Sequence, residues 1–350
     1  MKSPLLLALY IMTPLFFFVS CTTTLVPSYI YEESLNLKYP DSDFQKIDLY
    51  ALKTPAGVET DISALSEYLI EPAVNDWEKI RSIYTWICSN ISYDMGVYRG
   101  RIDIETKSED VLNSRSSVCS GYANLFNDLC IQAGLESVVI SGFAKGLSYS
   151  DGDDVSKANH AWNAVKIDNE WHLFDSTWSS GEVKGFAQND NYSDYWFNTD
   201  PEEFIYSHFP EKDQWQLLDP PVIRNTFTSW PDNVERLYKM GISIENFQEY
   251  YNSSDYNGIP RTYYWGQAPI EEAQIPLNPF LSPGESYHFQ IKAPHFYGLF
   301  LINNDKWIPL IKSGDTYSID FKPKAGKLIL VVKFSGNSYK YIILYKVGNS

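Results

Sequence analysis

Three residues near the middle of the chain, Cys119, His160 and Asp175, carry the side chains that covalent acyl transfer requires. A thiolate can attack a carbonyl carbon, an imidazole can take and return a proton, and a carboxylate can fix the imidazole tautomer and stabilise its charge. Each residue alone also has a structural explanation: a small residue at a helix start, a strand-end histidine bonded to the backbone, or a turn former. Their joint placement at the ends of neighbouring elements favours a catalytic triad.

The elements predicted around these residues explain why they would meet. In "SSVCSGYANLFNDL" the cysteine precedes a helical pattern of apolar residues that stops at Gly134, and the start of a helix favours thiolate over thiol. "HAWNAVKI" and "WHLFDSTW" alternate on either side of "DNE", which predicts a β-hairpin. His160 then opens the first strand and Asp175 closes the second, and adjacent antiparallel strands bring the two within side-chain reach.

The rest of the chain predicts an α+β fold. "NDWEKIRSIYTWICSNISYD" has helical spacing, with Asn75 as N-cap and Glu78 completing a capping box. We expect strands at "FQKIDLYAL" and "ESVVISGFAKG", and a short helix at "DNVERLYKM". After that helix, five strand candidates separated by Gly, Pro or Asn predict an immunoglobulin-like β-sandwich: "ESYHFQIKA", "YGLFLIN", "DTYSIDFKP", "KLILVVKF" and "KYIILYKV".

The stretches "SRSSVCSGYANLFNDLCIQAGL" and "NHAWNAVKIDNEWHLFDSTW" resemble the transglutaminase-like core of the papain-type superfamily. The family pattern has a cysteine before x-Gly-Tyr-Ala at a helix start, then His-Ala-Trp-Asn, then Trp-x-x-x-Asp-x-Thr-Trp. The segment "DYWFNTDPEEFIYSHFPEKDQWQLL" narrows the resemblance to the subgroup of kyphoscoliosis peptidase and a fungal cytokinesis protein. The resemblance implies a papain/transglutaminase-like core followed by an immunoglobulin-like β-sandwich.

By this resemblance Cys119 is the nucleophile, His160 is the base and Asp175 orients the base. The oxyanion would be held by the Cys119 backbone N–H and one further donor. The candidates for that donor, or for the wall of the cleft, are aromatic residues: Tyr93, Trp86, Trp162 and Trp178. Water as acceptor would make the chain a peptidase or amidase, and a lysine amine would make it a cross-linking transglutaminase. Without turnover it would be a noncatalytic surface-binding or scaffold protein. We place hydrolysis of peptide or amide bonds first.

The first residues of the chain indicate export. Lys2 precedes an apolar stretch from Leu5 to Val19, which Pro14 interrupts and which is short for a membrane span. The stretch ends at "FVSC", which resembles a bacterial lipoprotein signal with lipidation of Cys21; an ordinary secretory signal is the alternative. We therefore predict a lipid-anchored lipoprotein of the cell envelope. The expected organisation is a signal at 1–21, a tether and N-terminal extension at 22–58, a transglutaminase-like domain at 59–218 and an immunoglobulin-like domain at 219–350.

Composition and motifs narrow the partners. The net charge of −16 argues against a nucleic-acid partner. The family resemblance implies a protein or peptide substrate. No zinc-helix motif, paired CxxC or phosphate-binding glycine loop is present, and we predict no metal and no cofactor. Asp151, Asp153 and Asp154 could bind calcium but lack EF-hand spacing, so a solvated loop is favoured. Cys88 and Cys130 fit core positions, and a disulfide between them is left open.

Overall fold

The computed structural model of the chain describes residues 39, 42–96, 100, 104–146, 149, 153–184, 187–189, 192–263, 270–333 and 338–348. The predicted signal, Cys21 and the tether up to residue 38 lie outside these residues, as does Asp151 of the acidic loop. Within the part of the chain that is described, no helix is long and apolar enough to cross a bilayer.

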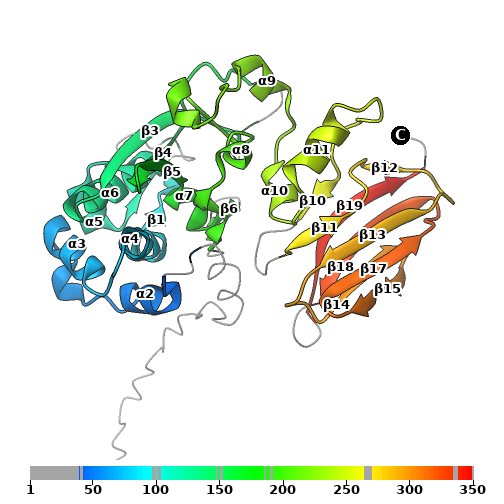
Figure 1. Cartoon of the computed structure of the whole chain (residues 1–350), viewed down its shortest axis with the longest axis horizontal. Helices are drawn as coiled ribbons and strands as arrows, with labels where there is room; N and C mark the ends of the chain where they lie inside the picture. Colours follow the sequence, from blue (N-terminus) through cyan, green and yellow to red (C-terminus); the bar gives the residue numbers. More distant parts are fainter. Residues whose placement is uncertain are drawn as a thin grey trace, which may run out of the picture.

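The first part of the chain is built on a five-stranded antiparallel sheet with the strand order β8-β5-β4-β3-β9 (Figure 1). The predicted hairpin is confirmed, since β4 pairs with β5 and the two are joined by Asp168 and Asn169. Both residues have positive φ (52° and 69°), as a two-residue type I′ turn requires. The strands are β3 Glu136–Ala144, β4 His160–Ile167, β5 Glu170–Phe174, β8 Phe197–Thr199 and β9 His208–Pro210.

Helices bury one part of this sheet. The predicted helix that opens with the cysteine is confirmed as α6, which lies against β3 and β4 and is surrounded by α3, α4 and α5. Their shared core contains fully buried aromatic residues, among them Tyr84, Trp86 and Phe126. The helices are α2 Phe44–Ala51, α3 Ile62–Ile70, α4 Asp76–Asn90, α5 Ser108–Ser114 and α6 Cys119–Gln132.

The predicted start of α4 is confirmed in part. The Asn75 side chain accepts a hydrogen bond from the Glu78 backbone N–H at 2.9 Å, so Asn75 is the N-cap. The Glu78 carboxylate accepts from the backbone N–H groups of Asp43 and Val74, both at 2.8 Å. Glu78 therefore ties the segment before α2 to the start of α4.

The predicted strand at "FQKIDLYAL" is wrong, because this segment forms helix α2. Its buried residues Phe44, Ile47 and Ala51 recur at helical spacing, and Asp43 caps the helix by accepting from the Lys46 backbone N–H at 3.0 Å. The amphipathic pattern is short enough to fit the two-residue period of a strand as well as the 3.6-residue period of a helix. Packing against α4 favours the helix.

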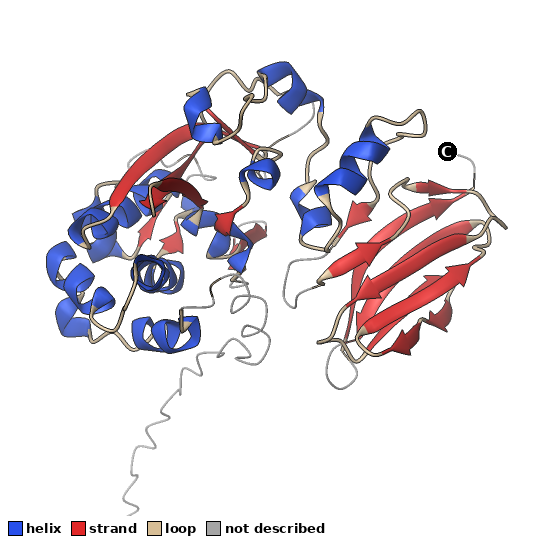
Figure 2. Cartoon of the chain, in the orientation of Figure 1, coloured by secondary structure: helices blue, strands red, loops and turns tan. Residues whose placement is uncertain are grey.

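The second part of the chain contains two mainly antiparallel sheets (Figure 2). Their strand orders are β10-β19-β18-β14-β15 and β11-β13-β17-β16. All five predicted strands are confirmed, and so is the short helix, α10 Glu235–Tyr238. Both sheets contribute to one core, where the rings of Phe289 and Tyr345 lie 6.0 Å apart. The immunoglobulin-like topology stays a prediction. The predicted strands correspond to β13 Tyr287–Lys292, β14 Gly298–Asn303, β17 Thr316–Phe321, β18 Gly326–Lys333 and β19 Tyr339–Val347.

The remaining strands of these two sheets are shorter. They are β10 Arg261–Thr262, β11 Glu272–Gln274, β15 Lys306–Pro309 and β16 Ile311–Ser313, and β12 Phe280–Leu281 pairs in parallel with β19.

Helices α9 (Arg224–Ser229), α10 and α11 (Ile244–Tyr251) connect the two parts. Phe227 of α9 is fully buried, and its ring lies 5.1 Å from that of Phe209 on β9. Both rings belong to the cluster that continues into the C-terminal sheets. The Lys145 ammonium donates to the backbone carbonyls of Phe227 and Trp230, at 2.7 and 2.8 Å, and so fixes α9 to the end of β3.

Candidate active site

Cys119 is the first residue of α6, where the backbone N–H groups have no acceptor within the helix. Its N-cap, Val118, makes no side-chain hydrogen bond to the helix, so the partial positive charge of the helix start is not offset there. Gly121 permits this close arrangement. A Cβ atom on Gly121 would lie 2.0 Å from Ser117 Oγ and 2.9 Å from Val111 Cγ2. Both distances are steric clashes, so a residue larger than glycine does not fit here without a shift of its neighbours.

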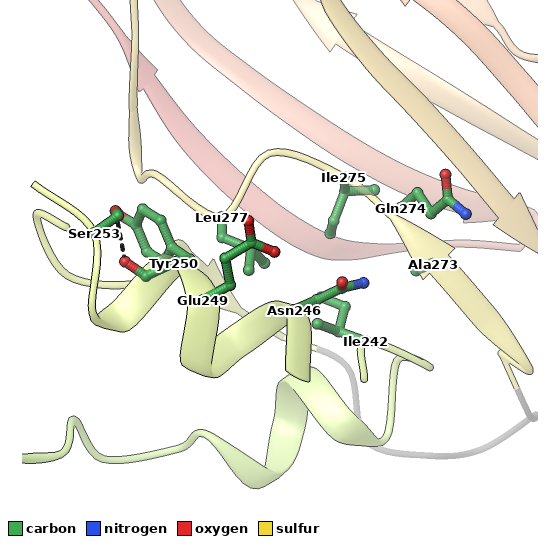
Figure 3. Close-up of a pocket in the computed structure, with 9 residues that line it drawn as sticks. All are labelled: Ile242, Asn246, Glu249, Tyr250, Ser253, Ala273, Gln274, Ile275 and Leu277. Carbon is green, nitrogen blue, oxygen red and sulfur yellow. Dashed lines mark hydrogen bonds between the residues drawn. The ribbon is translucent and has the colours of Figure 1, made fainter. Parts of the chain in front are cut away.

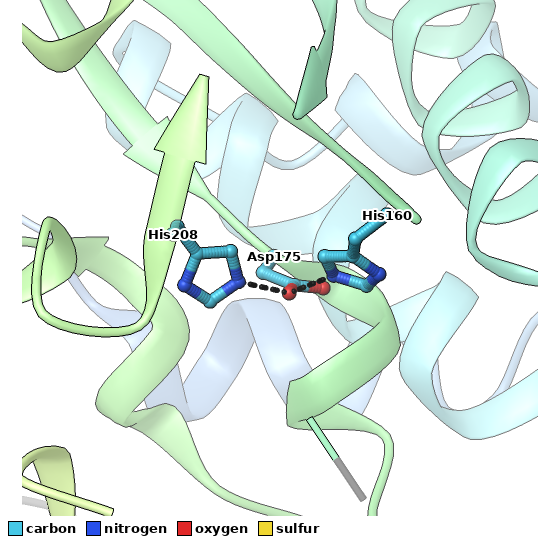
Figure 4. A group of neighbouring side chains, drawn as sticks. All are labelled: His160, Asp175 and His208. Carbon is cyan, nitrogen blue, oxygen red and sulfur yellow. Dashed lines mark hydrogen bonds and ion pairs between the residues drawn. The ribbon is translucent and has the colours of Figure 1, made fainter. Parts of the chain in front are cut away.

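His160 and Asp175 meet across the hairpin as the sequence predicts. His160 is the first residue of β4, and Asp175 follows β5 as the N-cap of α7 (Ser176–Ser179). His160 Nε2 lies 2.7 Å from Asp175 Oδ2 (Figure 4). Cys119 lies close enough to His160 and to the Ala161 backbone for both to interact with its thiol. Because Asp175 engages Nε2, the nitrogen left for the sulfur is Nδ1.

Electrostatics favour the charged form of all three groups. Burial raises the pKa of Cys119, but the attraction of His160 outweighs burial, and the pKa of Cys119 lies below its ordinary value. Burial lowers the pKa of His160, but Asp175 and Cys119 together raise that pKa to about 10. Burial raises the pKa of Asp175, yet the charge of His160 holds it well below its usual range. The three groups titrate as one unit, and their mutual attraction favours the combination of a thiolate, an imidazolium and a carboxylate.

A second histidine, His208, completes the site and was not singled out from the sequence. His208 is the first residue of β9, is 1% exposed, and places Nε2 3.0 Å from the same carboxylate oxygen, Asp175 Oδ2. Figure 4 shows the two imidazoles on opposite sides of the Asp175 carboxylate. The only sequence signal was its place in "FIYSHFPEK", within the segment that narrowed the family resemblance.

The Asp175 carboxylate is held at both oxygens. Oδ2 contacts the two histidines, while Oδ1 accepts from the Trp178 backbone N–H at 2.9 Å. The backbone carbonyl of Asp175 accepts from the Tyr84 hydroxyl on α4, also at 2.9 Å. Asp175 itself has no exposed surface, so these contacts replace the water that an ionised carboxylate would otherwise bind.

Asn163 joins the helix that carries the sulfur to the sheet that carries the histidine. It is 1% exposed, and its side-chain amide donates to the carbonyls of Ala123 on α6 and Val138 on β3, at 3.0 and 3.3 Å. This contact gives the asparagine of the sequence "HAWN" a physical role, because it fixes the distance between α6 and β4 on which the Cys119–His160 contact depends.

The aromatic candidates differ in where they lie. Trp86 is excluded as an oxyanion donor, because its indole N–H donates to Glu59 Oε1 at 3.0 Å within the helical core. Tyr93 lies beside the segment that precedes Cys119, since β1 (Ser92–Tyr93) pairs with β2 (Ser116–Ser117).

The two tryptophans Trp162 and Trp178 pack beside the histidines. The ring of Trp178 lies 5.4 Å from that of His160, and the ring of Trp162 lies 5.1 Å from that of His208. Trp178 is half-buried and Trp162 is buried. Tyr93, Trp162 and Trp178 stay candidates for the oxyanion donor or for the wall of the cleft.

The other expected features lie away from the triad. Cys88 and Cys130 are buried and form no disulfide. Asp154 is exposed and accepts from the Ser156 backbone N–H at 2.9 Å. A cavity of about 640 Å³ lies between α11 and the segment from β11 to Leu277, with Asn246, Glu249 and Gln274 among its polar residues (Figure 3). No residue of the triad lines this cavity.

The two histidines and the aspartate also have the composition of a metal site. Their potential ligand atoms lie within 4.8 Å of one another. Among the described residues, this is the group of histidine, cysteine and acidic side chains that could hold a metal ion. These atoms lie 2.7 and 3.0 Å from one another and form a hydrogen-bond network.

The position of the triad agrees with the comparison to family models. Residues 63–176 match the transglutaminase-like superfamily. The matched segment includes Cys119, His160 and Asp175 and ends directly after the aspartate. The resemblance on which the predicted roles rest is thereby confirmed at the level of the superfamily.

Two curated relatives are those that the sequence pattern indicated. Human kyphoscoliosis peptidase is 35% identical over 202 residues, which make up 57% of this chain and 30% of that protein. Cytokinesis protein 3 of Schizosaccharomyces pombe is 23% identical over 205 residues, 55% of this chain and 22% of that protein. The chain thus spans less than a third of either relative.

Among solved structures, one from Cytophaga hutchinsonii described as a candidate cysteine protease is 24% identical. It covers 39% of this chain and 44% of its own chain, with a TM-score of 0.28. A score this low does not establish a shared overall fold.

Proposed function

We propose that this chain is a cysteine-dependent acyl-transfer enzyme that hydrolyses peptide or amide bonds. The observation that carries the proposal is the 2.7 Å hydrogen bond between His160 and Asp175, together with the interaction of this imidazole with Cys119 at the start of α6. This arrangement supplies a nucleophile, a proton carrier and an orienting carboxylate in the roles that acyl transfer needs.

In the first half-reaction the Cys119 thiolate attacks the carbonyl carbon of the substrate and a C–S bond forms. The backbone N–H of Cys119 is placed to donate to the resulting oxyanion, because it belongs to the unsatisfied first turn of α6. His160 gives its proton from Nδ1 to the leaving nitrogen, the C–N bond breaks, and a thioester remains on Cys119. Asp175 keeps the imidazole oriented and stabilises its charge before the proton leaves.

In the second half-reaction His160 takes a proton from the acceptor, which attacks the thioester and releases Cys119. Water as acceptor gives hydrolysis, and a lysine amine gives a cross-link. The superfamily match to a transglutaminase-like model favours the cross-linking reaction as the second candidate. A noncatalytic scaffold role would leave the ionised pair of Cys119 and His160 without a use.

The proposed substrate is a protein or peptide, and the proposed location is the cell envelope. Export and lipidation of Cys21 rest on the sequence pattern at "FVSC". Fractionation of cells that express the chain or its Cys21→Ala variant would test the anchor.

The reaction is tested by incubating the protein with a glutamine-containing peptide and a fluorescent primary amine, with Cys119→Ala as the control. We expect release of ammonia or a cut peptide from the parent and neither from the variant. Incorporation of the amine would replace hydrolysis by cross-linking as the main reaction. Equal product from the parent and the Cys119→Ala variant would contradict the proposed nucleophile.

A further inference from the structure

His208 is a buried titratable group that the acyl-transfer steps do not use. It lies on β9 at the edge of the five-stranded sheet, and its ring is packed by Phe204 and Trp178, whose ring centroids lie 4.1 and 4.4 Å away. Such a site would suit an apolar ring better than an imidazole, unless both ring nitrogens have partners. Both do, since Nε2 lies 3.0 Å from Asp175 Oδ2 and Nδ1 lies 2.8 Å from Ser207 Oγ.

These contacts fix which nitrogen carries the proton. Burial lowers the pKa of His208 to about 4, so the imidazole is neutral near pH 7 and holds one proton. The ionised Asp175 carboxylate can only accept, which places that proton on Nε2. Nδ1 is then an acceptor for the Ser207 hydroxyl. The hydrogen bonds therefore run from Ser207 to His208 and from His208 to Asp175.

The charged groups around His208 keep it neutral while His160 is charged. On one side His208 faces Asp175 and, beyond it, His160, whose ring centroid lies 5.4 Å away. From α10 it faces the Lys239 ammonium, which also disfavours a positive charge on His208. A second imidazolium here would compete with His160 for one carboxylate and repel it. A neutral donor stabilises the carboxylate without this competition.

We propose that His208 is a positioning residue of the triad, a neutral donor that holds Asp175 Oδ2 in the direction of His160. With Trp178 at Oδ1 and two imidazoles at Oδ2, both the plane and the rotation of the carboxylate are determined. Loss of the His208 donor would leave Oδ2 with one partner and let the carboxylate turn. The inference rests on the proposed function and adds a residue to its machinery.

The test measures, as a function of pH, the rate at which iodoacetamide alkylates Cys119. Peptide mapping identifies the alkylated cysteine, and the proteins compared are the parent, His208→Leu and His208→Gln. At mildly acidic pH we expect iodoacetamide to alkylate Cys119 about tenfold more slowly in His208→Leu than in the parent. The reason is that loss of a hydrogen bond to the charged Asp175 leaves the His160 imidazolium less well stabilised, and this imidazolium stabilises the thiolate. His208→Gln, whose amide nitrogen can replace Nε2, should restore most of the rate.

Phe204→Leu is the matched packing control. It removes the ring that stacks on His208 but no donor to Asp175, so its pH profile should match that of the parent even where its melting temperature falls. If His208→Leu folds and keeps the parental profile, or if Phe204→Leu changes the profile as much, the positioning role is wrong. Absence of preferential Cys119 alkylation in the parent would instead contradict the proposed function itself.

Discussion

At the scale of single residues, the site depends on one carboxylate shared by two imidazoles in opposite protonation states. His160 is held charged by the attraction of Asp175 and Cys119, and His208 is held neutral by burial. Both contact Asp175 Oδ2, so the difference between them comes from their surroundings and not from their partner. The protein thereby separates the proton carrier from the group that only positions it.

The neutrality of His208 has a consequence for stability. Its pKa falls from about 6.5 in the unfolded chain to about 4 in the native protein, so between these values the unfolded state binds a proton that the native state does not. The native state is therefore destabilised as the pH falls through this window. We expect this one group to cost about 2 kcal/mol of unfolding free energy between pH 7 and pH 5.

Urea unfolding of the parent and of His208→Gln at both pH values measures this contribution, because the other titrating groups are common to the two proteins. The parent should lose more stability on acidification than the glutamine variant. An identical loss in both would show that His208 does not remain neutral in the native state.

At the scale of elements, a buried arginine fixes α2 and the segment before β8 to α4. Arg81 has no exposed surface, binds Asp48 of α2 through Nε and Nη2 at 2.8 and 2.9 Å, and binds Asp194 at 2.6 Å. The Tyr192 hydroxyl also donates to Asp194, at 2.7 Å. These contacts hold the helix that supports Tyr84, and hence the Asp175 backbone, in place.

Removing the arginine should leave two half-buried carboxylates, Asp48 and Asp194, without this counterion. We expect Arg81→Ala to lower the unfolding free energy by about 3–5 kcal/mol. The matched control is Lys79→Ala on the same helix, which breaks an exposed pair with Asp76 and should cost at most about 1 kcal/mol. Denaturant unfolding of both variants checks this, and equal losses would contradict a structural role for Arg81.

The elements show what the sequence could and could not predict. Local patterns placed α6, the β4–β5 hairpin and the C-terminal strands correctly, because each has a clear period and clear turn residues. They did not predict α2, whose pattern is short, or the role of Arg81, whose partners are 33 and 113 positions away in the chain.

His208 was missed for the same reason as Arg81. Its short strand carries no period, and its partner Asp175 is 33 positions away. Cys119, His160 and Asp175 could be predicted because each stands at the end of an element whose pairing is local. A residue that enters the site from a distant edge strand leaves no such signal.

At the scale of the whole molecule, β9 links the triad to the C-terminal sheets. His208 bonds Asp175, while the next residue, Phe209, joins the apolar cluster with Phe227 that continues into those sheets. Tyr206, just before this strand, stacks on Trp230 and contacts Phe247 of α11, with ring centroids 4.2 and 5.4 Å apart. The strand that supports the aspartate is thus itself supported by the second part of the chain.

The central claim is that Cys119 is ionised by its contact with His160, and the most direct measurement is the ultraviolet absorbance of the thiolate as a function of pH. The difference between the parent and Cys119→Ala isolates this sulfur from Cys88 and Cys130. Because the pKa of Cys119 is lowered from its ordinary value of 9.0, the account predicts that the thiolate band emerges below pH 9.0. A band that emerges only at or above pH 9.0 would contradict it.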